Sequence, residues 1–365
     1  MTEELVYRIA LTKLPNIGPK ISKALLNYFG SAASVFKSSF KDRLQVAGVG
    51  SSISKLFDDI HIIEEAKKEY DFILENNLSL LFYQDDNYPR RLKHFDQSPI
   101  ILYYKGSADL NPNKTVAIVG TRNPTPKGKV TTEKIVKNLS PLGVTIVSGL
   151  AFGVDAIAHK TSVIEGMPTV GVLGHGLDRI YPQEHRKLSL NMVENGGLLT
   201  EFCSGTNPDR QNFPMRNRII AALADVIIVV ESKIKGGSII TAEFANEYNK
   251  DVFAIPGRPD DLNSQGCNGL IKRTKAHLME NVEDLKYIMR WENVEKPKTL
   301  QSNLFQQLSK DELEVVDLIR MNKEITIDGL SYKLSKNSSE LASLLLNLEF
   351  KGVVRSLPGS RYLII

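Results

Sequence analysis

The sequence predicts an α/β protein built on a doubly wound, mostly parallel sheet, with a helical segment before the sheet and a small helix-and-hairpin segment after it. The main observation is that short apolar runs without charges alternate with helical patterns between residues 114 and 288. Such alternation is typical of a parallel sheet that helices cover on both faces. The length of 365 residues predicts two or three domains, because a chain of this size is rarely built around a single hydrophobic core.

The apolar runs give the expected elements of this central, Rossmann-like domain. Strands are expected at 115–120, 144–149, 168–174, 197–202, 226–231 and 251–257, and helices at 128–139, 153–165, 216–224 and 238–249. Two further strand-like runs, 78–83 and 100–106, are expected to form the lead-in edge of the sheet. We therefore place the domain at 69–290, with its core at 114–288. In such sheets ligands bind at the carboxyl ends of the strands.

Residues 1–68 contain two short glycine turns, each followed by a helical pattern. The turns are Leu14–Gly18 and Val46–Gly50. The pair resembles a double helix-hairpin-helix (SAM-like) domain, in which backbone N–H groups after the glycine turn can contact a DNA phosphate. Ordinary turns in a small helical bundle would give the same pattern, so both interpretations stay open.

The end of the chain predicts a linker and a third domain. Residues 291–304 are polar and are typical of a linker, and residues 305–365 contain three helical patterns and a hairpin turn at Pro358–Gly359, which resembles a winged helix. Its third helix carries no lysine or arginine between Lys336 and Lys351. Helices that read DNA normally carry basic residues, so we hypothesise that this domain contacts protein or tunes regulation.

Composition narrows the class of partner. The chain has 46 basic and 42 acidic residues and a net charge of +4, so any nucleic acid must be bound through a local pocket and not by a general positive field. No apolar run has the length of a membrane span and Met1–Ala10 holds no signal-peptide core, which predicts a cytoplasmic protein without membrane insertion. Cys203 and Cys267 have no metal-type spacing and are expected to be free thiols; neither a metal nor a cofactor is expected.

Glycines, basic residues and one aromatic gather where the expected strands end. Glycines let a backbone approach a ligand, and helix N-termini bind anions, so this is the chemistry of a polyphosphate or nucleic-acid site. Neither a dinucleotide-binding G-x-G-x-x-G nor a P-loop occurs. The candidate binding residues are Gly120, Thr121, Arg122, Gly149, Gly153, Arg210, Phe213, Arg216, Asn217, Lys235, Gly237 and Ser238.

An ordered set of motifs gives a specific resemblance. The stretches are VAIVGTR, VSGLAFGVDAIAHK, GLDRIYPQEH, FPMRNRIIAALAD, VVESKIKGGSIITAEFA and VFAIPG followed by NSQGCNGLIKRTKAHL. Together they resemble the DprA/Smf family of DNA-processing proteins, over nearly the whole chain. The resemblance implies a homodimer, formed through the Rossmann-like domain, that binds and protects single-stranded DNA and loads the RecA recombinase during natural transformation, with no catalytic residues. It also implies that Arg122 contacts phosphate and that Arg210 and Phe213 lie in a binding loop, with Phe213 stacked on a base.

Several side chains have a structural interpretation beside the functional one. Arg216 and Arg218 either grip phosphate, begin a solvated helix, or pair with Asp155 or Glu231. Asn217 is expected to brace the loop, Asp155 to cap or brace the helix after the second core strand, and Ser238 to cap its helix. His159 and His175 are expected to be structural, because no nucleophile or carboxylate partner has a recognisable spacing to them.

Two other functions remain as alternatives. Residues Lys235–Glu243 are similar to the glycine-rich, glutamate-containing loop of the phosphoribohydrolase (lysine-decarboxylase-like) family, which predicts an enzyme that processes nucleotides. No second carboxylate for glycosidic cleavage accompanies Glu243, and the extra domains suit nucleic acid better. A pure protein-interaction scaffold is the third interpretation, and it predicts no salt-dependent binding of single strands.

Overall fold

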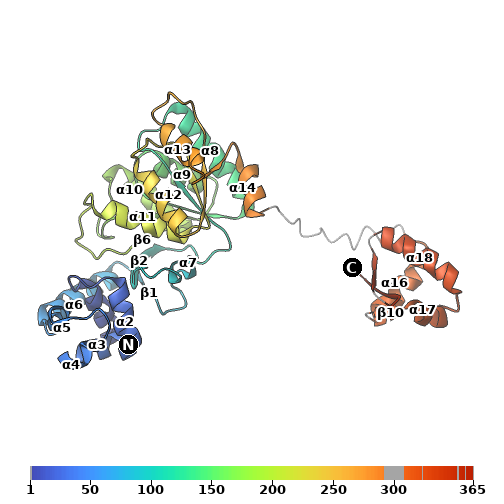
Figure 1. Ribbon diagram of the computed structural model, residues 1–365, viewed down its shortest axis with the longest axis horizontal. Coiled ribbons are helices and arrows are strands. Elements are labelled where there is room, and N and C mark those ends of the chain that lie inside the picture. Colours follow the sequence, from blue (N-terminus) through green and yellow to red (C-terminus); the bar gives the residue numbers. More distant parts are fainter. Residues whose placement is uncertain (1, 292–307, 323, 352, 358, 365) are drawn as a thin grey trace. The chain divides into compact units, whose positions relative to one another are not determined.

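The computed structural model describes residues 2–291, 308–322, 324–351, 353–357 and 359–364 (Figure 1). The chain divides into two compact units, Met1–Trp291 and Glu292–Ile365. Of the linker predicted at 291–304, all but Trp291 lies outside the described residues. Among the helices that are described, none is both long and apolar enough to cross a membrane.

The first unit holds the predicted sheet, which has nine strands within the described residues. Their order is β1-β2-β6-β5-β4-β3-β7-β8-β9, and all neighbours from β6 to β9 are parallel, whereas β1 and β2 form an antiparallel edge. The doubly wound, mostly parallel fold is thereby confirmed. The strands are β1 (Ser79–Phe82), β2 (Ile101–Gly106), β3 (Thr115–Val119), β4 (Thr145–Ser148), β5 (Thr169–Val172), β6 (Gly197–Thr200), β7 (Val226–Val229), β8 (Asp251–Ala254) and β9 (His277–Leu278).

Helices cover both faces of the sheet, as charge-free strands require. In β3, Val116 and Ile118 pack with one set of helices, and Ala117 and Val119 pack with the other, which is the period of two expected of a strand. One face carries α8 (Pro126–Leu139), α9 (Val154–Ile164), α10 (Arg186–Asn195) and α14 (Val282–Met289). The other carries α11 (Asn212–Leu223), α12 (Gly237–Glu247) and α13 (Gln265–Lys272).

The strand order creates a switch point beside β3. From β3 the chain winds outward in one direction through β4, β5 and β6, and it then returns to the other side of β3 to continue through β7, β8 and β9. Strand β3 therefore pairs with both β4 and β7. The helices on the two sides of such a point diverge, and a crevice opens outside the carboxyl ends of β3 and β7.

The N-terminal helices pack against the antiparallel edge of the sheet and share one core with Phe82, Ile101 and Tyr103. Helices α2 and α5 follow Gly18 and Gly50, as predicted, although neither has a side-chain cap. The boundary expected at residue 68 is wrong, because it falls inside α6, where Ala66 and Ile73 continue one buried face. The helices are α1 (Thr2–Lys13), α2 (Pro19–Phe29), α3 (Ala32–Lys37), α4 (Phe40–Arg43), α5 (Ser51–Leu56) and α6 (Ile60–Glu75), followed by the short α7 (Arg90–Lys93).

The second unit contains the three predicted helices and the predicted hairpin. Its helices are α16 (Lys310–Asn322), α17 (Ile327–Leu334) and α18 (Ser338–Phe350), and its strands are β10 (Glu324–Thr326), β11 (Val354–Leu357) and β12 (Arg361–Ile364). The sheet order is β10-β12-β11. Strand β10 was not predicted, because three residues are too few to show a period of two. Of the expected turn, Gly359 has the left-handed φ of 85° that favours glycine, and Pro358 lies outside the described residues.

Candidate functional site

A crevice of about 580 Å³ opens at the carboxyl ends of β3 and β7. Ten of the twelve candidate residues line it: Gly120, Thr121, Arg122, Arg210, Phe213, Arg216, Asn217, Lys235, Gly237 and Ser238. The other two, Gly149 and Gly153, follow β4 and lie behind its wall. The sequence thus led to residues from three separate segments, 120–122, 210–217 and 235–238, that the fold brings together in one crevice.

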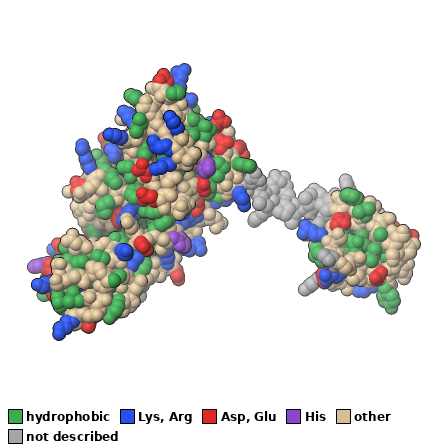
Figure 2. Space-filling view, viewed as in Figure 1, with side chains coloured by type: hydrophobic (Ala, Val, Ile, Leu, Met, Phe, Trp, Pro, Cys, Tyr) green, Lys and Arg blue, Asp and Glu red, His purple; other side chains and the backbone are tan. Residues whose placement is uncertain are grey.

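The crevice is locally basic. Besides the buried Arg216, four exposed cations line the crevice: Arg122, Arg210, Lys233 and Lys235. Within the described part of the chain, the side chains of these four form no hydrogen bond or ion pair. Asp155 is the one carboxylate in the lining. On the face of the first unit shown in Figure 2, acidic and basic side chains are interspersed. Positive potential is therefore concentrated in the crevice, where low-dielectric walls strengthen it.

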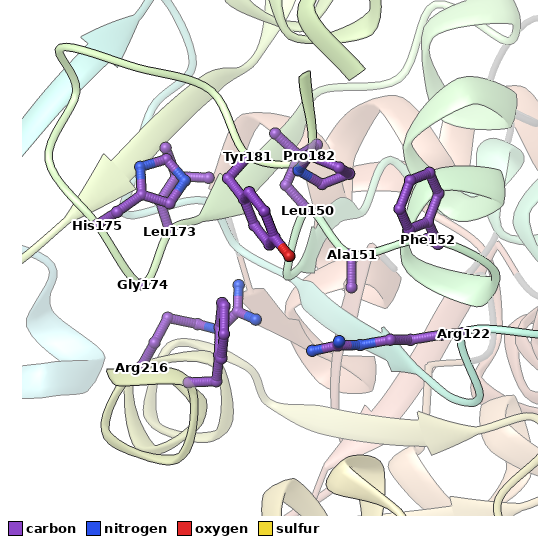
Figure 3. A pocket seen from close by; sticks show the side chains of 11 residues that line it. Arg122, Leu150, Ala151, Phe152, Leu173, Gly174, His175, Tyr181, Pro182 and Arg216 are labelled. Atoms are coloured by element: carbon purple, nitrogen blue, oxygen red, sulfur yellow. The ribbon is translucent and has the colours of Figure 1, made fainter. Parts of the chain in front are cut away.

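Arg216 is the buried cation of the crevice and projects from α11, with 6% of its surface exposed. Its Nη1 donates to the backbone oxygen of Val172, and its Nε donates to Asn217 Oδ1 at 3.2 Å. Burial lowers the pKa of Arg216 to about 10, while the carboxylate of Asp155 opposes that shift, so the guanidinium stays charged at neutral pH. Figure 3 shows Arg216 approaching the pocket from α11 and Arg122 approaching it from the turn after β3.

Gly149 makes room for this charged pair. A Cβ atom at this position would lie 2.4 Å from Asp155 Oδ2 and 2.6 Å from Arg216 Nη1. Asp155 lies in the first turn of α9 and accepts from the N–H of Ala151 at 3.4 Å. It does not cap the helix, whose N-cap is Gly153; it ties the loop before α9 to the first turn of that helix. Burial raises the pKa of the Asp155 carboxyl, and Arg216 counteracts that rise.

The turn that carries Arg122 is fixed by backbone contacts. Thr121 N–H donates to the backbone oxygen of Glu231 at 2.7 Å, and Val154 N–H donates to the backbone oxygen of Thr121 at 3.2 Å. Gly153 has a φ of 82°, and a Cβ there would lie 2.3 Å from Thr121 O. This glycine therefore allows the turns after β3 and β4 to pack together and positions Arg122.

Phe213 lies in the first turn of α11, not in a loop before it. The helix was predicted to begin at Arg216, but it begins at Asn212. Pro214 fits in its first turn, because the N–H groups there have no intrahelical partner. The half-buried ring packs on Gly174, and the Arg122 guanidinium carbon lies 5.5 Å from the ring centre, which is a cation–π distance. The aromatic ring of Phe213 and the guanidinium of Arg122, which has no ion-pair partner within the described residues, thus lie side by side in the crevice lining.

The N-terminus of α12 forms the opposite wall. Its cap is Gly236, which has no side chain, so the prediction that Ser238 caps this helix is wrong. Ser238 lies one residue further inside the helix and donates its hydroxyl to Ser232 Oγ at 2.8 Å. Asn217 donates to the backbone oxygen of Gly237 at 3.3 Å, which holds this loop against α11. The free N–H groups of a helix N-terminus favour anions.

Comparison with known proteins agrees with this geometry. The sequence model of the family described as DNA recombination-mediator protein A matches residues 79–290. The chain belongs to this family. The resemblance to DprA/Smf proteins is thereby confirmed, and with it the function class of a DNA-processing recombination mediator.

The relatives cover most of the chain. Protein Smf of Synechocystis is 38% identical over 275 residues, which are 73% of this chain and 68% of that protein. The structure is similar to that of DNA processing protein A (DprA) from Streptococcus pneumoniae, with a TM-score of 0.66 and 31% identity over 78% of this chain and 97% of that one. It is also similar to DNA processing protein A from Helicobacter pylori, with a TM-score of 0.53 and 32% identity over 58% and 95% of the two chains. The latter structure is described as showing a single-stranded DNA binding mode.

Other side chains of this recombination-mediator fold have structural roles. Arg218 forms a largely buried ion pair with Glu201 and also donates to the backbone oxygen of Gln97. It is not among the residues that line the crevice. The expected alternative of a pairing with Glu231 is wrong, because Glu231 accepts from Thr125 N at 2.9 Å and Thr125 Oγ1 at 2.6 Å at the start of α8.

The two histidines are bound within the fold, as expected. His159 is fully buried between Thr169 Oγ1 and the backbone oxygen of Gly149, both at 2.6 Å, and burial lowers its pKa to about 4. His175 has only 1% of its surface exposed, and its Nδ1 lies 2.8 Å from the backbone oxygen of Gly176. Both cysteines are free thiols, with Cys267 buried and Cys203 half-buried.

Two lining residues whose side chains suit a contact with DNA were not among the candidates. Lys233 lines the crevice, and its position in the same loop as Lys235 was an available signal. Tyr181 lines a smaller adjoining pocket, where its ring centre lies 6.2 Å from that of Phe213. It comes from the loop after β5, whose sequence has no periodicity that would show which way a side chain points.

Proposed function

We propose that the crevice binds single-stranded DNA and that the protein, acting in the cytoplasm, is a recombination mediator that protects the strand and passes it to RecA. The observation that carries this proposal is the cluster of five cations around Phe213 at the switch point of the sheet. Phosphates would lie against the cations, and a base would stack on the ring. The single-strand binding mode described for the H. pylori relative, at 32% identity, supports it.

In this proposal the basic residues contact phosphates and the aromatic residue contacts a base. Arg122, Arg210 and Lys235 contact phosphates from exposed positions, and Arg216 offers its Nη2 from the wall of the crevice. Phe213 stacks on a base, a contact worth about 1–3 kcal/mol that tolerates any base because each has a π-face. The N-terminus of α12, with Gly237 and Ser238, supports a further phosphate.

The binding test uses fluorescence anisotropy with labelled single-stranded and double-stranded oligonucleotides. We expect Phe213→Ala to weaken single-strand binding by about 5- to 100-fold, which corresponds to the loss of one stacked base, and Arg122→Ala to weaken it as well. Tyr287→Ala is the matched control, because Tyr287 is 77% exposed on α14, outside the crevice. Unchanged affinity in both crevice variants would overturn the assignment of the site.

We also propose a homodimer formed through the Rossmann-like domain and a contact with RecA. Light scattering measures the mass in solution, and a monomer at all concentrations would contradict the dimer. RecA loading is measured as stimulation of RecA strand exchange on DNA covered by single-strand-binding protein. Stimulation by the wild type and none by Phe213→Ala is the expected result.

The second unit is proposed to contact protein or to tune regulation instead of reading DNA. The outer face of α18 exposes Ser339, Ser343 and Asn347 and carries no basic residue. The two lysines that flank the helix are engaged in ion pairs, Lys336 with Asp311 and Lys351 with Glu312. We expect the fragment 305–365 not to bind duplex DNA at physiological salt, and micromolar affinity would contradict the proposal.

We propose that the crevice performs no catalysis. Glycosidic cleavage of a nucleotide uses two carboxyl groups that flank the scissile bond. Asp155, held beside Arg216, is the one residue with a carboxyl side chain in the crevice lining. Glu243 is exposed on α12 and is not part of that lining. Incubation with nucleoside monophosphates is expected to release no free base, and clear turnover would favour the enzyme instead.

A further inference from the structure

The loop between β6 and α11 carries one of the proposed phosphate contacts, but it has no regular secondary structure. It spans residues 201–211, and Arg210, near its end, lines the crevice with an exposed side chain. An irregular segment reaches a defined conformation only when other contacts offset the backbone entropy that it loses, about 1–2 kcal/mol per residue. The position of Arg210 therefore depends on what holds this loop.

Glu69, on the N-terminal helix α6, holds the loop at Ser204. The backbone N–H of Ser204 donates to Oε1 of Glu69 at 2.9 Å, and its hydroxyl donates to Oε2 at 2.6 Å. Only 3% of Glu69 is exposed, because it lies on the buried face of α6 together with Ile62, Ala66 and Ile73. A carboxylate on such an apolar face is costly unless it is paired or hydrogen-bonded, and the two bonds to Ser204 meet that need.

Further hydrogen bonds connect this contact to the beginning of α11. The N–H of Gly205 donates to Asp178 Oδ1 at 3.1 Å, in the loop after β5. Nδ2 of Asn212, the first residue of α11, donates to the backbone oxygen of Asn207 at 3.0 Å. Arg210 lies between these two bonded residues, so its backbone is held on both sides.

The N-terminal helices also support the region by packing. Leu177 and Cys203 pack against the hydrophobic core that these helices share with the edge of the sheet. The Sγ atom of Cys203, next to Ser204 in the chain, lies 3.2 Å from the hydroxyl oxygen of Tyr103 on β2. The N-terminal helices and the loops beside the crevice therefore form one packed structure.

We propose that Glu69 is a positioning residue of the DNA site: through Ser204 it fixes the loop that presents Arg210 to a phosphate. The inference rests on the proposed single-strand binding, and Glu69 itself touches no DNA. The sign of the effect is diagnostic. Loss of an acidic side chain makes the net charge more positive and ordinarily strengthens DNA binding, whereas loss of Glu69 should weaken it.

The experiment measures anisotropy of the full chain with a labelled single-stranded oligonucleotide from 0.05 to 0.5 M salt. Glu69→Ala frees the loop, so the contact of Arg210 with phosphate should be lost. The slope of log K against log salt should become about 0.7 less steep, and relative to 1 M salt the affinity at 0.1 M should fall about fivefold. Glu75→Ala is the matched control, because Glu75 is exposed at the end of the same helix and its loss changes the net charge equally.

Three further variants trace the effect to this contact. Arg210→Gln removes the cation itself, so adding Glu69→Ala to it should weaken binding no further. Glu69→Gln can accept from the Ser204 N–H and donate to the Ser204 hydroxyl oxygen, so it should bind as tightly as Glu75→Ala. Ser204→Ala deletes only the hydroxyl bond and should weaken binding about twofold. Thermal unfolding checks each fold, and Ser204→Ala decides the matter if Glu69→Ala does not fold.

A wild type that does not bind single strands overturns the proposed function and this inference with it. If the wild type binds, equal affinities of Glu69→Ala and Glu75→Ala overturn the inference alone, as does unchanged binding in Ser204→Ala or Arg210→Gln. Equal weakening by Glu69→Gln and Glu69→Ala, or a further loss in the double variant, also overturns it. Weakening by Glu69→Ala that glutamine reverses and that Arg210→Gln does not increase supports it.

Discussion

Removal of one crevice cation should reduce the salt dependence of single-strand binding by a fixed step. Each phosphate neutralised on a single strand contributes about −0.7 to the slope of log K against log salt. Five cations line the crevice, so contact by all of them would give a slope of about −3.5. Lys235→Gln should reduce the steepness of that slope by about 0.7 and, relative to 1 M salt, weaken binding about fivefold at 0.1 M.

The matched control for this variant is Lys137→Gln, which makes the same change in net charge. Helix α8 runs from the carboxyl end of β3 toward the start of β4, so Lys137, in its last turn, lies at the opposite edge of the sheet. Anisotropy titrations from 0.05 to 0.5 M salt would give both slopes. Equal changes in the two variants would mean that a general field binds the DNA, and that result would refute the local crevice.

Three further substitutions test the support of the site and of the fold. Gly149→Ala should displace Arg216 and weaken single-strand binding about tenfold in the anisotropy assay, because its Cβ would lie 2.6 Å from Nη1. Arg218→Leu leaves Glu201 buried without its partner and should lower the free energy of unfolding, measured in urea at pH 7, by about 3–5 kcal/mol. Burial raises the pKa of Glu201, and a protonated Glu201 no longer needs a cationic partner. The difference in unfolding free energy between wild type and variant should therefore shrink as the pH falls toward 4.5 and grow as the pH rises. Burial lowers the pKa of His159 to about 4, so the folded protein holds this ring neutral. The resulting contribution to the unfolding free energy should be complete above pH 6.5 and fall by about 3 kcal/mol as the pH drops to 4. His159→Gln should flatten this part of the curve of unfolding free energy against pH.

The sheet could be predicted because its signal is local. A strand buried on both faces needs an uncharged apolar run, and β3 shows this in five consecutive buried residues, Thr115–Val119. The order of the strands has no such local signal. It was the alternation of strands and helices that implied a doubly wound sheet, and hence that Arg122 and Phe213 would meet at one edge.

The directions of side chains were harder to predict, as Arg216 and Arg218 show. Residues two apart on a helix point about 200° apart, so only one of the two can face the crevice. Both arginines lie in the helix expected at 216–224, but the helix period alone does not show which of the two faces the crevice. Pro214 is compatible with the earlier start of this helix, because the first turn of a helix accepts proline.

The glycines illustrate a signal with two causes. Gly149 and Gly153 were interpreted as places where a ligand approaches the backbone, yet protein atoms occupy the space that their Cβ atoms would need. A glycine that admits a neighbouring side chain and one that admits a phosphate look the same in a sequence. Only the fold shows that Gly149 admits Arg216 and Asp155.

If the proposed site is right, this arrangement lets a chain with a net charge of only +4 bind DNA at one place. Arg216 is fixed by the backbone of Val172 and by Asn217, so in the proposed complex it would contact a phosphate without first losing side-chain freedom. Its burial removes competing water, which makes the same charge more effective than on the surface. Asp155 stabilises the charge of the buried guanidinium. In the proposal the affinity then depends on a few positioned groups, and the exposed Arg122 and Lys235 add an attraction that salt can screen.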